Sequence, residues 1–452
     1  MDLPAHIFRE YDIRGVVGVD LDAASYHSLG AALGARFLED GAQEAVIGHD
    51  NRLHSPQMHD ALADGIRSTG LDVVSLGLVP TPALYHALAS RGDGCGAVVT
   101  ASHNPPEYNG LKIVSLGRAL SGAEIRELRT RALGELPKGE GAYRVEPGLD
   151  NYVEALSGLI IPARPVRVAV DCANGTSGTV ARRLFDAWGA EVEFLYEEPD
   201  GNFPNHPADP VVAENLKDLI ATVKGGGYAA GIAFDGDSDR IGVVDEKGQI
   251  LWGDQLLALF ARGVLAEHPG AKVIFEVKCS RALAEDIRAH GGDPVLWKTG
   301  HSLIKAKMKE TGALLAGEMS GHLFFADRYF GFDDALYAAG RLLETLAASD
   351  KSLSEILADL PRYFSTPEIK RTCPDDLKFE IVARLRDRLA EKYEVVDIDG
   401  VRLEMPEGWG LVRASNTSPV LVLRFEAESE EALQRIRSIM ESELEALLPE
   451  KA

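Results

Sequence analysis

Residues 229–240 read AAGIAFDGDSDR, an apolar run that leads directly into three aspartates at alternate positions. The run AAGIAF and the following IGVV predict two short buried β-strands. The same arrangement occurs twice more, because GAVV precedes TASHNPP at residues 100–106 and ALLA precedes GEMSGH at residues 317–322. In open α/β sheets, ligands gather at the carboxyl ends of strands. The placement of these three polar motifs therefore indicates ligand-binding loops.

Short apolar runs alternate with longer segments of helical period, which is typical of parallel α/β layers. Residues 56–68, 82–90 and 378–392 are among the predicted helices, and S-G-A-E at Ser121–Glu124 predicts a capping box. The Pro-rich IPARPVRVAVDCANG marks a boundary, and beyond Tyr363 the predicted order changes to α+β. We expect three similar mixed α/β domains (1–147, 148–249 and 250–362) and a smaller C-terminal α+β domain (363–452).

The composition excludes several classes of protein. The 452 residues carry 47 basic and 70 acidic side chains, a formal charge of -23, which disfavours nucleic acid and anionic membrane surfaces as partners. No apolar run approaches the roughly 18 residues of a membrane span, and the first residues do not have the pattern of a signal peptide. The four cysteines form no CxxC pair, which indicates reduced thiols. We expect a cytoplasmic monomer.

The alternate spacing of Asp235, Asp237 and Asp239 lets their carboxylates converge from one side of an extended segment onto a hard cation. A calcium EF-hand is an alternative, since Glu246 is the twelfth residue of a loop that begins at Asp235. However, the sixth position is Arg240 where an EF-hand needs glycine, and both flanks predict strands. A solvated acidic turn is the other alternative. We favour a Mg²⁺ site, because few protein ligands leave room for water and a phosphate oxygen.

Ser102 lies beside His103 in TASHNPP, on a turn restricted by two prolines. A hydrolase nucleophile would need a G-x-S-x-G elbow, which is missing. An ordinary Asn-Pro turn is the alternative interpretation. Lys112 lies on the next predicted strand, where plain surface charge is the alternative.

Two further motifs have the composition of ligand-binding loops. GEMSGH places Glu318, Ser320 and His322 between glycines, a set that hydrogen-bonds sugar hydroxyls well. RASNTSP, residues 413–419, combines a guanidinium with small donors and is suited to holding phosphate. A glycine turn with a solvated histidine and a Ser/Thr-rich loop are the respective alternatives.

Together these motifs, in this order from YDIRG at residues 11–15 to RASNTSP, resemble the α-D-phosphohexomutase family, and most closely its bacterial phosphomannomutase/phosphoglucomutase branch. The resemblance covers essentially the whole chain. It implies four domains around a central cleft, with a mobile fourth domain. The implied activity is the reversible conversion of hexose 1-phosphate and hexose 6-phosphate of mannose or glucose. Phosphoglucosamine mutase, a phosphatase and a non-catalytic phosphosugar-binding protein are the alternatives.

The resemblance also implies roles for individual residues. Ser102 would carry the phosphoryl group and would bind one Mg²⁺ together with Asp235, Asp237 and Asp239. A hexose 1,6-bisphosphate would be the bound intermediate and the activator. Charge on the transferring group would be neutralised by Arg14, Lys112 and Arg240, and the base would be His322, His301 or Lys112. The substrate hexose phosphate would contact Tyr11, Asn104, Lys278, His301, Glu318, Met319, Ser320, Gly321, His322, Arg413, Ala414, Ser415, Asn416 and Thr417.

One position departs from the family pattern. Ser238 in DGDSDR replaces the glycine of the commoner DGDGDR. The three aspartates are unchanged, so we expect metal binding to be retained.

Overall fold

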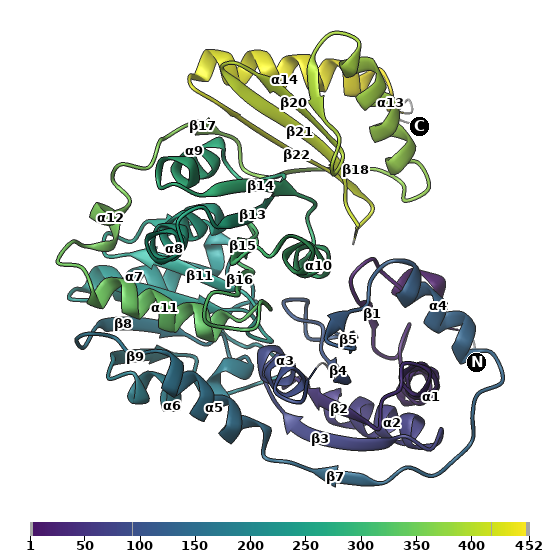
Figure 1. The fold of residues 1–452 in the computed structure, drawn as a ribbon. Coiled ribbons are helices and arrows are strands. Elements are labelled where there is room, and N and C mark those ends of the chain that lie inside the picture. The colour runs from purple at the N-terminus through teal and green to yellow at the C-terminus, as the bar shows by residue number, and fades with distance from the viewer. Residues whose placement is uncertain (1–2, 93, 417, 449–452) are drawn as a thin grey trace.

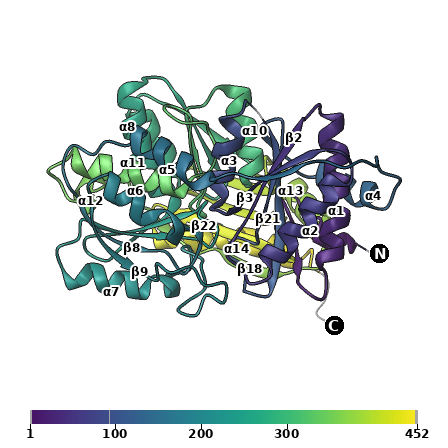
Figure 2. The ribbon, with the colours of Figure 1, turned by 90° about the horizontal axis from the view of Figure 1, so that it is seen from below.

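The computed structural model describes residues 3–92, 94–416 and 418–448, which form four β-sheets with their helices. The fourth sheet (yellow-green in Figure 1) lies on one side of the molecule, across from the first sheet (purple and blue). Viewed from below, elements of the first two sheets lie side by side in front of the fourth (Figure 2). Among the described residues, no helix combines the length and apolarity of a membrane span. All four cysteines are buried and free.

The first sheet has the strand order β1-β5-β4-β2-β3-β7, with β6 beside β5. Its strands are β1 (Ile13–Val16), β2 (Glu44–His49), β3 (Asp72–Leu78), β4 (Cys95–Val99), β5 (Tyr108–Ser115), β6 (Arg118–Ala119) and β7 (Tyr143–Val145). The helices of this part of the chain are α1 (Ala23–Glu39), α2 (Ser55–Arg67), α3 (Thr81–Ala89), α4 (Ala123–Ala132) and α5 (Gly148–Leu159).

The second and third sheets follow along the chain. The second contains β8 (Arg167–Asp171), β9 (Glu191–Leu195), β10 (Ala230–Phe234), β11 (Ile241–Asp245) and β12 (Ile250–Leu251), with α6 (Ala181–Ala187) and α7 (Lys217–Gly225). The third contains β13 (Lys272–Glu276), β14 (Asp293–Trp297), β15 (Leu315–Gly317) and β16 (Leu323–Phe325). Its helices are α8 (Gly253–Glu267), α9 (Arg281–Ala289) and α10 (His301–Thr311), followed by α11 (Ala335–Ala347) and α12 (Leu353–Ile356).

These three sheets share one topology. The neighbouring strands are β3-β2-β4-β5 in the first, β9-β8-β10-β11 in the second and β14-β13-β15-β16 in the third. In each set the first three strands are parallel, and the fourth returns antiparallel. The three motifs TASHNPP, DGDSDR and GEMSGH all occupy the hairpin between the third and fourth strands of their set. The repeat therefore places three different chemistries at equivalent positions.

The fourth sheet is antiparallel and contains β17 (Phe364–Ser365), β18 (Ile369–Thr372), β19 (Glu394–Val396), β20 (Val401–Met405), β21 (Gly408–Ala414) and β22 (Val420–Ala427). Helices α13 (Lys378–Ala390) and α14 (Glu430–Glu445) cover its outer face (Figure 1). Because side chains alternate along a strand, the other face can point toward the first three sheets.

The fourth sheet has an apolar core of its own and a small apolar contact with the third domain. One large cluster joins side chains of the first three sheets, such as Val98, Ile232 and Phe325. The fourth sheet has its own cluster around Phe425 and Ile436 on its helix-covered face. On the opposite face, a small cluster of Val277, Trp409 and Leu411 joins the fourth sheet to the third domain.

The predicted capping box at the start of α4 is wrong. The helix begins at Ala123, and its N-cap is Gly122 with a φ of 54° and no side-chain cap. Glu124 instead forms two hydrogen bonds of 2.6 Å with Arg118. A bidentate guanidinium–carboxylate pair is stronger than a neutral cap bond, so the acid turns away from the helix terminus. The helices predicted at 56–68, 82–90 and 378–392 correspond to α2, α3 and α13.

Candidate active site

A cavity of about 720 Å³ lies where loops of all four sheets meet. Each sheet contributes polar side chains to its wall, among them Ser102, Arg240, Ser320 and Arg413. Ligand cavities commonly enclose about 300–1,000 Å³, so this one has room for a small molecule. The residues that line it come from segments up to four hundred positions apart.

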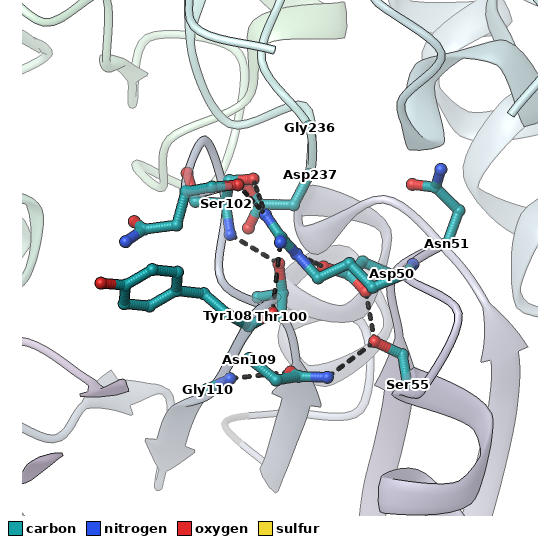
Figure 3. A network of polar contacts seen from close by, with 12 residues as sticks. Asp50, Asn51, Ser55, Thr100, Ser102, Tyr108, Asn109, Gly110, Gly236 and Asp237 are labelled. Atoms are coloured by element: carbon teal, nitrogen blue, oxygen red, sulfur yellow. Dashed lines mark hydrogen bonds and ion pairs between the residues drawn. The ribbon is translucent and has the colours of Figure 1, made fainter. Parts of the chain in front are cut away.

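Ser102 is buried in the wall of this cavity. Its Oγ donates a hydrogen bond of 2.7 Å to Oδ2 of Asp235, which belongs to the second sheet. Its φ of 52° is left-handed, a conformation that is unfavourable for a residue with a Cβ. Its amide donates to Thr100 Oγ1 at 2.9 Å, and this contact appears in Figure 3. The backbone is therefore held in a strained geometry that aims the hydroxyl at the metal loop.

The acidic motif forms the tight connection between the antiparallel strands β10 and β11, a geometry that excludes an EF-hand, whose loop joins two helices. Asp235, Asp237 and Asp239 are fully buried, with carboxylate oxygens within 4.8 Å of one another. Burial and the two neighbouring carboxylates raise the pKa of Asp235 well above its usual value. Such a cluster calls for a cation.

The available ligand atoms suit a hard divalent ion. The Oδ1 atoms of Asp237 and Asp239 are buried without a hydrogen-bond partner, and buried polar atoms are rarely left unsatisfied. Carboxylate and hydroxyl oxygens are preferred ligands of Mg²⁺. Ser238 adopts a φ of 66° in this loop, where glycine would be unstrained, and its hydroxyl bonds to Thr176 at 2.9 Å. The departure from the commoner motif is thus accommodated without moving a carboxylate.

Lys112 is a buried residue of β5 and not a surface charge. Its Nζ donates to Asp237 at 2.6 Å and also to Asp239. Burial alone would lower its pKa, but these two carboxylates raise the pKa well above the usual value. Arg14 lies near this pair in the cavity wall and donates to Asn104 and Asp12. Lys112 therefore borders the metal loop, and Arg14 adds a second cation to the same cavity wall.

The GEMSGH hairpin contributes Glu318, Met319, Ser320 and His322 to the cavity wall. The Glu318 carboxylate accepts the amide of Gly300 at 2.6 Å, and burial raises its pKa. Gly321 has a φ of 87°, and a Cβ there would lie 2.3 Å from the carbonyl oxygen of Ile241. The close approach holds this hairpin against the strand that follows the metal loop.

Two histidine rings lie stacked beside this hairpin. The centroids of His301 and His322 are 5.5 Å apart, and Arg240 Nε donates to His322 Nε2 at 3.0 Å. Asp333 Oδ2 lies 3.1 Å from His322 Nδ1 and 3.7 Å from His301 Nδ1, while Lys305 binds its other oxygen at 2.7 Å. Burial and the charge of Lys305 lower the pKa of His301 well below its usual value. Both effects disfavour the protonated form of His301.

The fourth sheet faces the cavity with a row of cations. On three adjacent strands, Val422 of β22 lies between Lys370 of β18 and Arg413 of β21. All three residues line the cavity, together with Arg424. Arg413 Nε donates to Asp399 at 3.0 Å, while Lys278 from the third sheet lies 3.2 Å from Glu368. Several positive charges at one end of a cavity are suited to an anion.

Tyr11 connects three domains at the cavity wall. Its hydroxyl donates to the carbonyl oxygen of Thr299 at 2.7 Å and accepts a hydrogen bond from Asn416 Nδ2. Its position brings the first sheet into contact with a loop of the third and with the RASNTSP hairpin of the fourth. Burial raises the pKa of this phenol, so it stays protonated and can donate.

The structure brings most of the sequence-predicted residues to the cavity but not all. Ala414 packs in the apolar core of the fourth sheet, and its side chain does not line the cavity. Asn104, Gly321 and the three aspartates are not part of the wall either, although Asn104 accepts from Arg14 and Asp235 from Ser102, which both line it. Ser415 lies in the wall. Thr417 is outside the described residues.

Other residues near the cavity were missed by sequence reasoning. Lys370 and Arg424 were missed. Strand alternation could have found Arg424, because in VLVLRF it stands between Leu423 and Phe425, whose side chains face the core of the fourth domain, and therefore points to the opposite face. No local pattern marks Asp333, because its partners come from other elements.

Comparison with known protein families identifies the class of this four-domain fold. Four models match in order: "Phosphoglucomutase/phosphomannomutase, alpha/beta/alpha domain I" at residues 5–135, domain II at 150–248, domain III at 252–364 and the C-terminal domain at 368–442. The chain belongs to the phosphoglucomutase/phosphomannomutase family.

Individual relatives agree over almost the whole length. The chain is 49% identical over 447 residues to a phosphomannomutase/phosphoglucomutase of Pseudomonas aeruginosa, covering 98% of this chain and 96% of that one. A crystal structure of a phosphoglucomutase/phosphomannomutase family protein from Burkholderia thailandensis aligns with a TM-score of 0.93 at 45% identity, covering 100% and 99% of the two chains. A probable phosphoglucosamine mutase of Methanopyrus kandleri is more distant, at 38% identity and 94% coverage of both chains.

The hydroxyl of Tyr11 joins loops of three domains at the cavity wall, so its removal should affect ligand binding. Tyr11→Phe should weaken hexose phosphate binding by about twofold to tenfold, because the contact that joins three domains at the cavity wall loses a net value of roughly 0.5–1.5 kcal/mol. Isothermal titration of glucose 1-phosphate measures the change. Tyr363→Phe is the matched control, since its hydroxyl joins Glu285 outside the cavity. Equal affinities of Tyr11→Phe and the parent protein would contradict a binding role for this contact.

Proposed function

We propose that this protein interconverts the 1-phosphates and 6-phosphates of mannose and glucose through phosphorylated Ser102 and a bound hexose 1,6-bisphosphate. The observation that carries the proposal is the hydrogen bond between Ser102 and Asp235 in a cavity that the cations of the fourth sheet also face. One side of the cavity is suited to phosphoryl transfer, and the other to holding a second phosphate.

The reaction is two phosphoryl transfers in opposite directions. In the first, the bond from phosphorus to Ser102 Oγ breaks, and a bond from phosphorus to a sugar hydroxyl oxygen forms. The hydroxyl proton passes to a base, and Oγ takes up a proton as it leaves. The bisphosphate then turns in the cavity and returns its other phosphoryl group to Ser102 by the reverse chemistry. Positioning and charge neutralisation account for most of the catalysis in such transfers.

Ser102, Asp235, Asp237 and Asp239 are the residues that would hold Mg²⁺. When bound, the ion neutralises charge on the transferring group. Lys112, Arg14 and Arg240 add fixed positive charge around the same group. Because Lys112 donates to two carboxylates, it stays protonated and acts as a charge. Because His322 Nε2 already accepts a hydrogen bond from Arg240, we assign the base to His301.

Substrate recognition is divided between two hairpins. Glu318, Ser320 and His322 offer acceptors and donors for sugar hydroxyls. Arg413, with Ser415 and Asn416 beside it, faces the same cavity and would hold the phosphate that does not react. Because mannose and glucose differ only at C2, contacts to their shared hydroxyls accommodate both. A fourth domain with its own core can move to admit substrate and exclude water.

A mutase assay tests the proposal directly. Mannose 1-phosphate and glucose 1-phosphate, each primed with a trace of hexose 1,6-bisphosphate, should both be converted to the 6-phosphates. Ser102→Ala should lower kcat by a factor on the order of 10³ or more, because the covalent carrier is lost. Its affinity for sugar phosphate should remain. Ser115→Ala is the control, since Ser115 is buried at the end of β5, the strand that follows the Ser102 loop, but bonds to Asp40.

Several outcomes would contradict this prediction. Full activity of Ser102→Ala would remove that residue from the reaction. Conversion of glucosamine phosphate alone would favour the phosphoglucosamine mutase alternative. Release of free phosphate as fast as substrate disappears would indicate a phosphatase.

Removal of divalent ions should abolish turnover, and Mg²⁺ should restore it. Asp237→Asn should weaken Mg²⁺ affinity by more than the roughly 10–100-fold typical of an outer-shell partner, because a direct ligand is lost. Asp245→Asn is a suitable control, since this buried carboxylate caps backbone amides at the other end of β11. Calorimetric titration of the chelated protein with Mg²⁺ gives the affinities. An unchanged affinity in Asp237→Asn would exclude the motif as the metal site.

Arg413→Ala should weaken binding of glucose 1-phosphate by about 1.5–3 kcal/mol, the value of a hydrogen bond to a charged group. Arg371→Ala is the matched control. Arg371 lies on β18 of the same sheet, next to Lys370, and pairs with Glu445 away from the cavity. Binding constants from titration compare the two variants. Equal losses in both would indicate a general effect of charge and not a phosphate contact.

A further inference from the structure

Arg52 is a fully buried arginine outside the cavity, in the loop between β2 and α2. Its Nε donates to the carboxylate of Asp50 at 3.0 Å, and the ring of Phe203 from the second domain lies 5.2 Å from its Cζ. The other four N–H groups donate to backbone carbonyl oxygens. A guanidinium has five N–H donors, so every one of them is used.

Three of these carbonyl oxygens belong to the loop that carries Ser102, and the fourth belongs to Tyr108, the first residue of β5 after the loop. Nη2 donates to Ser102 at 2.9 Å and to Asn104 at 2.7 Å. Nη1 donates to Pro105 at 2.6 Å and to Tyr108 at 3.2 Å. One rigid planar group therefore fixes the whole connection between β4 and β5. The loop makes these contacts through its backbone, so they do not depend on its side chains.

The Ser102 conformation needs such support. A left-handed residue with a Cβ costs roughly 1–2 kcal/mol, and Ser102 has a φ of 52°. Its amide is held by Thr100 Oγ1 and its carbonyl by Arg52, so the peptide units on both sides are fixed. Without the bond to the carbonyl, the loop could relax toward an unstrained conformation and turn the hydroxyl away from Asp235.

The metal loop contacts the same carbonyl. A Cβ on Gly236 would lie 2.5 Å from the oxygen of Ser102, so the two loops touch through their backbones. Figure 3 shows Ser102 with Gly236 and Asp237 above it and Thr100 below it, and with Asp50 and Asn51 to the right. A shift of the Ser102 carbonyl would therefore change the position of the Ser102 hydroxyl relative to the carboxylates of the metal loop.

We propose that Arg52 is a positioning residue for phosphoryl transfer, which holds Ser102 Oγ in line for both half-reactions through the loop backbone. The inference rests on the proposed role of Ser102. Because Oγ must be phosphate donor in one step and acceptor in the next, its position has to be the same before and after the intermediate turns. A displacement of about 1 Å can cost on the order of a hundredfold in rate.

Arg52→Lys is the primary variant, because lysine keeps the charge beside Asp50 but cannot reach four carbonyls with a planar fork. We expect kcat to fall about a hundredfold. KM and the affinity of the unphosphorylated enzyme for glucose 1-phosphate should stay within twofold. Arg341→Lys is the matched control: Arg341 is also buried, pairs with Asp327 and lies 4.8 Å from the Phe325 ring, but it contacts no cavity loop. Its kcat should be unchanged.

A double variant, Asp50→Asn with Arg52→Gln, removes the fork without leaving an unpaired buried charge. It should show the same fall in kcat with unchanged affinity. A kcat within threefold of the parent in either variant overturns the proposal, as does a loss of affinity that matches the loss of kcat. If both variants unfold at assay temperature, Arg52 serves the fold as a whole and the proposal is overturned. Full activity of Ser102→Ala would instead refute the proposed function itself, so the two failures are distinguishable.

Discussion

The structure depends on keeping several like charges together in a buried space. Asp235, Asp237 and Asp239 belong to the second sheet, and Lys112, which neutralises two of them, belongs to the first. Thr81 at the start of α3 also donates to Asp237, at 2.6 Å. Buried carboxylates without such partners would be strongly destabilising. The contacts of Lys112 and Thr81 with these carboxylates therefore hold the first two domains together in the arrangement that also places Ser102 against Asp235.

The repeated topology explains how one cavity acquires distinct functions. Each of the first three sheets ends its parallel set with an antiparallel hairpin, and that hairpin carries the serine, the acidic motif or the GEMSGH motif. The fourth sheet lacks the repeat but adds cations from three adjacent strands. In our account, transfer chemistry, sugar recognition and phosphate binding are supplied by separate domains. A substrate that must turn within the cavity then meets fixed groups on every side.

Much of this arrangement could be predicted from the sequence, because strand periodicity and the position of each motif after a strand are local signals. The α/β class and the helices of the first domain were of this kind. The convergence of Ser102 with the acidic motif was implied by the family resemblance, because no local signal joins segments more than a hundred positions apart. The capping box failed because Arg118, six residues away, competed for Glu124. Lys112 could not be distinguished from a surface lysine, since its burial depends on carboxylates over a hundred positions later. Arg52 and Asp333 had no local signal, because their partners are distant in the chain.

The central claim is that the phosphoryl group on Ser102 and the divalent ion share one site. Mn²⁺ takes the same oxygen ligands as Mg²⁺ and is paramagnetic, so it broadens the ³¹P resonance of a phosphate that it contacts. In phosphorylated enzyme, equimolar Mn²⁺ should broaden the phosphoserine resonance beyond detection, while Mg²⁺ should leave it sharp. A resonance that stays narrow while Mn²⁺ is bound would place the ion away from Ser102 and contradict the account.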